Sequence, residues 1–164
     1  MKAQRDGETR SQMTSIYNEL KINDRLSTSG VIPAECFAEL AASGFEVVIN
    51  LLPDSSEYAI KTESESLAEL GIAYVYIPVD FAAPSHADFE AFSQAMDAAS
   101  EKKTWVHCAA NWRVTAFTSL YLQREGHMNT DEAEALIAKM WEPDAIWSTF
   151  ISSVRAGLAT ERDD

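Results

Sequence analysis

A cysteine and an arginine near the middle of the chain could together bind and attack an oxyanion. Cys108 follows a short apolar segment, and Arg113 comes after four intervening residues, which are Ala109, Ala110, Asn111 and Trp112. A cysteine between a buried strand and a helix has backbone N–H groups and the positive end of the helix dipole directed at it. Such surroundings lower the pKa of a thiol and create a nucleophilic thiolate. An arginine in the first helical turn adds a planar fork of donors for a tetrahedral oxyanion.

An inert, buried cysteine is the alternative, because an isolated cysteine at a strand end usually belongs to the core. The strand before Cys108, the adjacent His107 and the nearby Arg113 together favour the functional interpretation. Trp112 must either wall the pocket or pack beneath it on the helix. The other tryptophans stand in apolar patterns and are expected in the core: Trp105, Trp141 and Trp147.

The remaining cysteine and histidines do not form a second chemical centre in the sequence. Cys36 and Cys108 are far apart and lack a C-x-x-C partner, which argues against a disulfide scaffold and a zinc site. Cys36 lies on the apolar face of a predicted helix and is expected in the core. His86 and His127 lack ligand-like spacing and are expected at the surface, so no metal and no cofactor is predicted.

Strands and helices that alternate along the chain must position this loop. Strands are predicted over residues 46–52, 72–77 and 104–107, the first without alternation, as suits a strand covered on both faces. The predicted helices cover residues 33–44, 56–70, 88–99, 115–124, 131–140 and 144–157. Asp88 is expected to cap the third helix, and Asn129 or Thr130 the fifth. This alternation predicts an α/β fold with a central, mostly parallel sheet flanked by helices.

Length and charge limit the possible functions. The 164 residues are expected to form one domain over residues 1–164, with frayed ends at about 1–13 and 159–164. A net charge of −13, spread along the whole sequence, makes nucleic acid an unsuitable partner. No stretch approaches the roughly 20 apolar residues that cross a bilayer, so no membrane partner and a cytoplasmic location are expected. The oligomeric state is left open.

The pair His107-Cys108, followed by a short loop and Arg113, resembles the signature of the protein tyrosine phosphatase superfamily. The likeness is to its small, dual-specificity-like branch, and in particular to an uncharacterised bacterial group. It runs from about residue 20 to about residue 125, and three further segments agree with it: 26–30, 48–51 and 76–80. The resemblance implies a dual-specificity phosphatase fold. It also implies that the His107 ring stays in the interior and orients the loop through backbone hydrogen bonds.

The loop departs from the family pattern in length and in composition. The family places five residues with a glycine between cysteine and arginine, whereas this chain has four and no glycine. A shorter ring has one fewer N–H group for phosphate oxygens, and the missing glycine is expected to restrict positive-φ backbone at the turn. The family's hydroxyl residue after the arginine bonds the thiolate. Here Val114 takes that place and Thr115 follows it.

Asp80 is the candidate general acid, because the family supplies a carboxylic acid from a nearby loop to protonate the leaving oxygen. If the strand over 72–77 neighbours the strand over 104–107 in a parallel sheet, Asp80 and Cys108 emerge at one edge. A solvated loop carboxylate is the alternative for Asp80. Asp88 is the fallback acid.

The resemblance implies a cysteine-dependent hydrolase of phosphate monoesters, acting on phosphotyrosine-like or small phosphoesters through a cysteinyl-phosphate. Cys108 would be the nucleophile, Asp80 the acid, and Arg113 with the loop backbone from Ala109 to Trp112 the phosphate site. Its partners would be phosphorylated substrates or other small oxyanions. One alternative is a rhodanese-like sulfurtransferase, since that family has a Cys-to-Arg loop of the same length. Another is a catalytically weak, phosphatase-like domain that binds an anion or partner.

Overall fold

The centre of the sheet consists of two of the apolar segments that the sequence predicts as strands. The computed structural model, which describes residues 16–163, places β3 (Val47–Asn50) parallel to β5 (Thr104–His107). Every residue of both strands is buried, because helices cover both faces of the sheet. The third predicted strand, β4 (Ala73–Tyr76), lies parallel to β3 at one edge.

Two strands that the sequence patterns did not predict complete the sheet. β2 (Leu26–Ser29) pairs in parallel with β5, and β1 (Leu20–Asn23) pairs antiparallel with β2 at the second edge. The order is β1-β2-β5-β3-β4. β2 has the mostly polar sequence LSTS although all its residues are buried, and β1 has the sequence LKIN, so neither contains the apolar run that predicted the other strands. The predicted fold class, a mostly parallel sheet flanked by helices, is confirmed.

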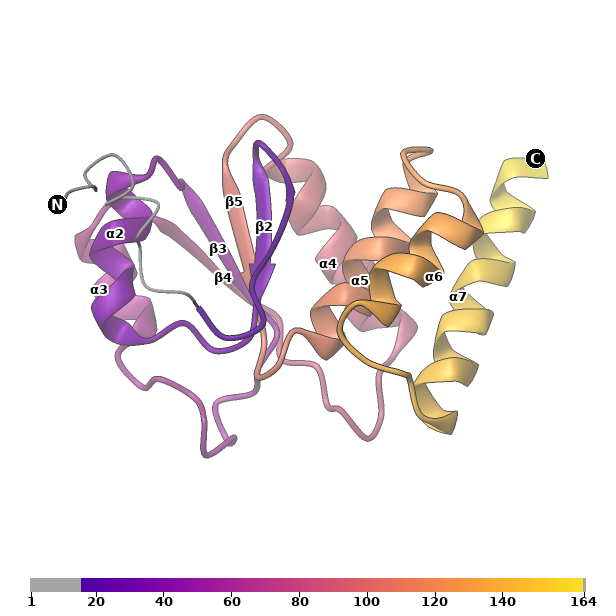
Figure 1. The fold of residues 1–164 in the computed structure, drawn as a ribbon, viewed down its shortest axis with the longest axis horizontal. Helices are drawn as coiled ribbons and strands as arrows, with labels where there is room; N and C mark the ends of the chain where they lie inside the picture. The colour runs from indigo at the N-terminus through magenta and orange to yellow at the C-terminus, as the bar shows by residue number, and fades with distance from the viewer. Residues whose placement is uncertain (1–15, 164) are drawn as a thin grey trace, which may run out of the picture.

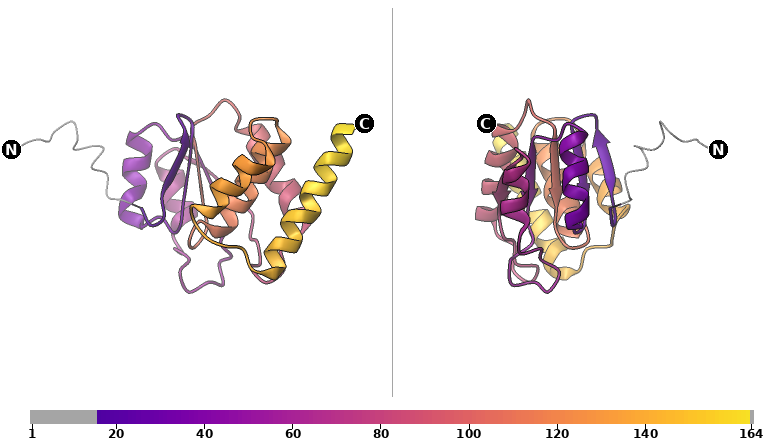
Figure 2. Two further views of the ribbon diagram at one scale, coloured as in Figure 1. Left: turned by 45° about the vertical axis from the view of Figure 1, so that its right-hand side comes forward. Right: turned by 90° about the vertical axis from the view of Figure 1, so that its left-hand side faces the viewer.

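The helices form one layer on each face of the sheet (Figure 1). One layer contains the 3₁₀ helix η2 (Ala34–Cys36), α2 (Phe37–Ala42) and α3 (Glu63–Glu69). The other contains α4 (His86–Ala98), α5 (Trp112–Arg124), α6 (Thr130–Ala138) and α7 (Ala145–Asp163). Figure 2 shows the same layers from two other directions. No helix among the described residues has the length and apolar character that crossing a membrane requires.

The alternation of side chains along β5 divides the core into two clusters. Trp105 packs with Phe37 and Leu40 on the α2 side of the sheet, whereas Val106 packs with Phe117 on the α5 side. Because successive side chains point to opposite faces, His107 faces the same side as Trp105, and Cys108 joins the α5 side. The predicted nucleophile and its neighbouring histidine are therefore separated by the backbone.

Several element boundaries differ from the sequence prediction. The helix expected over 56–70 forms only at Glu63–Glu69, and α5 begins at Trp112. Asp88 does not cap α4, because Ser85 is the N-cap and Asp88 closes a capping box with it. Asn129 caps α6, as one of the two expected residues. Helix α7 continues through residues for which fraying was expected, whereas residues 1–13 lie outside the described part.

Candidate active site

The Cys108 loop turns its carbonyl groups outward. The Cys108 carbonyl accepts from His107 Nδ1 at 3.2 Å, and the Ala109 carbonyl accepts from the Val31 N–H at 3.1 Å. The Ala110 carbonyl accepts from Asn18 Nδ2 at 2.9 Å. Since N–H and C=O point in opposite directions across a trans peptide, the N–H groups of Ala109 and Ala110 face away from these partners. The first N–H groups of α5 add to them, because they have no acceptor within the helix.

Asn111 gives the loop the left-handed turn that was expected to be restricted without glycine. Its φ is 69°, and its side chain is fully buried. The side-chain Nδ2 donates to the Asn18 carbonyl at 2.8 Å and to Thr28 Oγ1 at 3.0 Å. Asparagine tolerates this backbone region better than most residues. The expected restriction is therefore wrong, because an asparagine held by its side chain takes the place of glycine.

Gly30 lets β2 approach the loop more closely than any other residue could. A Cβ atom at this position would lie 2.4 Å from the carbonyl oxygen of Ala109. The contact is to backbone, so it could be relieved only by moving the loop or the strand. The N–H of Cys108 also donates to Ser29 O at 3.3 Å, which ties the loop to the end of β2.

Arg113 is half-buried at the start of α5. Its Nη1 donates to the Val79 carbonyl at 3.2 Å, and its guanidinium lies 5.4 Å from the centre of the Phe81 ring. Burial lowers the pKa of Arg113, and the nearby negative groups of Cys108 and Asp80 act in the opposite direction. The segment that follows β4 therefore holds the guanidinium on one side. The other N–H groups of the guanidinium stay available for an anion.

Asp80 and Arg113 line one cavity of about 430 Å³ together with Phe81, Ser55 and Ser56. Asp80 is exposed, and its Oδ1 accepts from the Ala82 N–H at 2.9 Å. The strand before Asp80, β4, was expected to lie beside β5. This expectation is wrong, because β3 lies between them. All three strands are parallel, so the loops that follow them still meet at one edge of the sheet.

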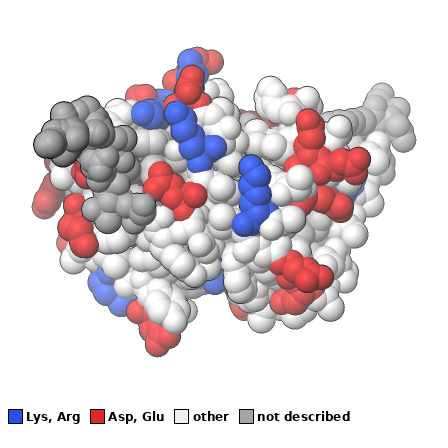
Figure 3. Space-filling view, in the orientation of Figure 1, with Lys and Arg blue, Asp and Glu red and all other residues white. Residues whose placement is uncertain are grey.

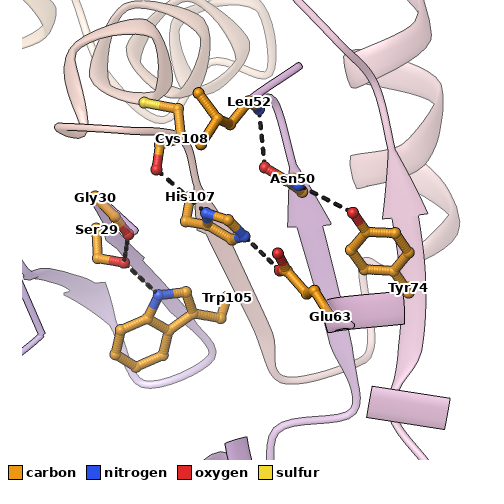
Figure 4. Close-up of polar contacts among 9 residues, drawn as sticks. All are labelled: Ser29, Gly30, Asn50, Leu52, Glu63, Tyr74, Trp105, His107 and Cys108. Atoms are coloured by element: carbon orange, nitrogen blue, oxygen red, sulfur yellow. Dashed lines mark hydrogen bonds and ion pairs between the residues drawn. The ribbon is translucent and has the colours of Figure 1, made fainter. Parts of the chain in front are cut away.

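A buried carboxylate that the sequence analysis missed lies on the other side of the loop. Glu63, in α3, is 3% exposed, and its Oε2 lies 2.5 Å from Nε2 of His107, which is 1% exposed. Figure 4 shows the imidazole between this carboxylate and the Cys108 carbonyl, with the Cys108 sulfur pointing away from the ring. Glu63 stands in a polar stretch, where its one signal is a position one helical turn before the buried Leu67.

The remaining predicted site residues lie around the start of α5. The Thr115 hydroxyl donates to the Trp112 carbonyl at 3.0 Å. The Trp112 ring is 39% exposed and stacks on half-buried Trp141 with ring centroids 5.0 Å apart. Trp112 therefore does not pack beneath the pocket in the core. Trp105 and Trp147 are buried, as predicted.

Cys36 and the other two histidines lie apart from this centre. Cys36 belongs to the core cluster on the opposite face of the sheet from Cys108. Burial, with Glu35, Glu39 and Glu19 nearby, raises the pKa of its thiol. His86 and His127 are exposed, as predicted. The described residues contain no group of three or more metal-ligating side chains.

Comparison with known proteins gives matches over most of the chain. A family model described as DSP-PTPase phosphatase fused to NAD+ kinase matches residues 8–145. A crystal structure of a DUF442 protein from Shewanella putrefaciens CN-32, described as a candidate phosphatase, is 34% identical with a TM-score of 0.82. The match covers 92% of this chain and 98% of that one.

More distant or longer proteins complete the comparison. The structure of Pseudomonas aeruginosa TpbA in complex with phosphotyrosine is 16% identical with a TM-score of 0.67. The match covers 87% of this chain and 90% of that one. At this identity the likeness supports a shared fold and nothing further. A beta-lactamase hydrolase-like protein of Xylella fastidiosa is 34% identical over 118 residues, which are 70% of this chain. The match spans 27% of that relative's length.

Proposed function

The chain belongs to the family of DSP-PTPase phosphatases fused to NAD+ kinase, and from this membership we propose that it is a cysteine-dependent phosphatase that hydrolyses phosphate monoesters. One observation carries the proposal. The loop between Cys108 and Arg113 bonds its carbonyl groups to the scaffold, which leaves N–H groups for an oxyanion beside a cavity that contains Arg113 and Asp80. Because the chain spans about a quarter of the curated relatives it matches, the proposal concerns this part alone.

The proposed reaction has two steps at phosphorus. The thiolate of Cys108 attacks in line, so that an S–P bond forms while the P–O bond to the leaving group breaks, and Asp80 gives its proton to the departing oxygen. The Asp80 carboxylate then takes a proton from a water that attacks the cysteinyl-phosphate, which releases phosphate and returns the thiolate. Arg113 and the loop N–H groups stabilise the charge on the equatorial oxygens.

The substrate would be a phosphotyrosine-like or small phosphoester. The cavity beside Arg113 offers Phe81 as an apolar wall and Ser55 and Ser56 as polar contacts. The mechanism needs no metal or other cofactor, because thiolate, carboxylic acid and guanidinium supply the nucleophile, the proton and the charge stabilisation.

Hydrolysis of p-nitrophenyl phosphate at about pH 5–6, where a carboxylic acid and a thiolate can coexist, tests the proposal. Wild-type protein should release p-nitrophenol, Cys108→Ser should not, and Cys36→Ser should stay near wild type, since Cys36 lies across the sheet. Activity of the wild type no greater than that of Cys108→Ser would refute a phosphatase.

Two observations favour a second candidate, a phosphatase-like domain that binds an anion without efficient turnover. The loop has four intervening residues rather than five, and Cys108 is only 1% exposed. Binding of phosphate measured by calorimetry, without hydrolysis of phosphate esters, would identify this function.

The short loop also suits a sulfurtransferase, because a persulfide needs less space than phosphate. Release of thiocyanate from thiosulfate and cyanide, lost in Cys108→Ser, would identify that reaction instead.

A further inference from the structure

The proposed reaction leaves one buried ionisable pair unused. Glu63 and His107 lie on the face of the sheet opposite the Cys108 sulfur, with Nε2 and Oε2 2.5 Å apart and both side chains excluded from water. The other ring nitrogen, Nδ1, lies 3.2 Å from the carbonyl oxygen of Cys108 (Figure 4). His107 therefore bridges α3 and the first peptide of the loop.

The chemistry of the two partners determines where the ring must carry protons. The Cys108 carbonyl can only accept, so Nδ1 must be the donor. The Glu63 carboxyl group and Nε2 then share one further proton, either as carboxylate and imidazolium or as carboxylic acid and neutral ring. Both arrangements are neutral overall and keep Nδ1–H on the carbonyl. A ring flip would break both hydrogen bonds, because it would place ring carbons opposite the Cys108 carbonyl and the Glu63 carboxyl group.

No other described charge competes for this carboxyl group in the hydrogen-bond and ion-pair network. Tyr74 lies close enough to interact electrostatically with Glu63. Burial raises the pKa of the Tyr74 hydroxyl to about 12, so this group stays neutral. The Tyr74 hydroxyl instead accepts from Asn50 Nδ2 at 2.9 Å. Among the described residues, His107 is the one ion-pair partner that Glu63 has.

We propose that Glu63 is a positioning residue, which acts through His107 to hold the Cys108 peptide in the orientation that turns the Ala109 N–H towards a bound oxyanion and the thiolate. This inference deepens the proposed function, since it concerns the same loop. A carbonyl pinned on one side of a planar peptide fixes the N–H on the other side. Loss of the carboxyl group leaves the ring one hydrogen bond and allows its other tautomer, which has no proton on Nδ1.

Two substitutions of Glu63 separate this role from simple packing. In Glu63→Gln the amide can donate to Nε2 and keep the proton on Nδ1, whereas Glu63→Leu fills the space without a hydrogen bond. Glu65 is exposed on the same helix, so Glu65→Leu is the matched control. Removing one partner of a buried ionic pair is destabilising, because the remaining partner loses its compensation. We therefore expect Glu63→Leu to melt below wild type and Glu63→Gln and Glu65→Leu to melt close to it, and each variant is compared at a temperature where it is folded.

Alkylation by iodoacetamide, followed at Cys108 by peptide mass spectrometry, measures thiolate reactivity without requiring any turnover. We expect a fall of about tenfold or more in Glu63→Leu, about threefold or less in Glu63→Gln, and no change in Glu65→Leu. A wild-type rate in Glu63→Leu would overturn the proposal, and so would an equal loss in Glu63→Gln. If the protein proves not to hydrolyse phosphate esters, these rates still decide the role of Glu63.

Nitrogen NMR of the imidazole groups gives a second measurement that does not depend on folding of the variants. The chain has three histidines, and His86 and His127 are exposed, so His107 should be distinct in a ¹⁵N-histidine spectrum of the wild type. We expect a protonated Nδ1 at neutral pH. An unprotonated Nδ1 would overturn the proposal.

Discussion

At the scale of single residues, the loop depends on one side chain as much as on its backbone. Asn111 accepts a left-handed conformation and uses its amide to hold the Asn18 carbonyl and the Thr28 hydroxyl. In return, Asn18 holds the Ala110 carbonyl. The four-residue loop therefore combines a turn that usually needs glycine with an anchor that glycine could not provide.

Two substitutions separate the contributions of Asn111 to stability, which are its left-handed backbone conformation and its side-chain hydrogen bonds. Asn111→Gly keeps the backbone conformation and loses two hydrogen bonds, so we expect a loss of about 1–2 kcal/mol in the free energy of unfolding. Asn111→Ala also places at positive φ a residue that tolerates this region less well than asparagine, which adds about 1–2 kcal/mol. Urea denaturation measures both losses. Equal destabilisation by the two variants would show that the backbone conformation costs nothing here.

Asp80 is tested by its effect on leaving groups rather than by loss of rate alone. If Asp80 protonates the departing oxygen, Asp80→Asn should hydrolyse esters of basic leaving groups about 10²–10⁴-fold more slowly and acidic aryl phosphates much less so. A series of aryl phosphates of rising leaving-group pKa measures the dependence. Asp88→Asn is the control, because the Asp88 carboxylate is engaged in the capping box of α4, where it accepts from the Ser85 N–H. An unchanged dependence in Asp80→Asn would remove Asp80 from the mechanism.

At the scale of elements, the sequence could predict what hydrophobic patterns encode. β3, β5 and the helices from α4 to α7 contain apolar runs or periods, and they formed near the predicted positions. β1 and β2 could not be predicted, since their sequences, LKIN and LSTS, lack the apolar run that marks β3 and β5. Strand order depends on contacts between distant segments, so the position of β3 between β4 and β5 was missed. The same limit applies to Glu63, whose partner His107 is 44 positions away.

The approach of β2 to the loop can be tested through its glycine. In Gly30→Ala the new Cβ would meet the Ala109 carbonyl at 2.4 Å, so we expect a loss of about 1–3 kcal/mol in stability and weaker phosphate binding. Gly157→Ala is the control, because nothing lies within 4 Å of its Cβ and alanine should stabilise α7 by about 0.5–1 kcal/mol. Thermal unfolding and calorimetry measure the effects. Unchanged phosphate affinity in Gly30→Ala would show that β2 does not set the loop geometry.

At the scale of the whole molecule, the charge of the surface opposes the charge of the expected ligand. The chain has a net charge of −13, and Figure 3 shows acidic side chains spread over one face with fewer basic ones among them. Arg113, the basic residue of the cavity, is half-buried beside Asp80. The long-range field therefore repels polyanions, while the loop attracts a single phosphate at short range.

This opposition predicts that flanking charge and salt govern substrate choice. For two phosphotyrosine peptides of equal length, one with lysines and one with glutamates around the phosphate, kcat/KM should be about tenfold or more higher for the basic peptide at low ionic strength. The difference should shrink as sodium chloride is raised from about 0.01 to 0.5 M, since the Debye length falls from about 30 Å to a few ångströms. p-Nitrophenyl phosphate, which has no flanking charge, serves as the control. A preference for the acidic peptide, or one that salt leaves unchanged, would show that local contacts outweigh the overall field.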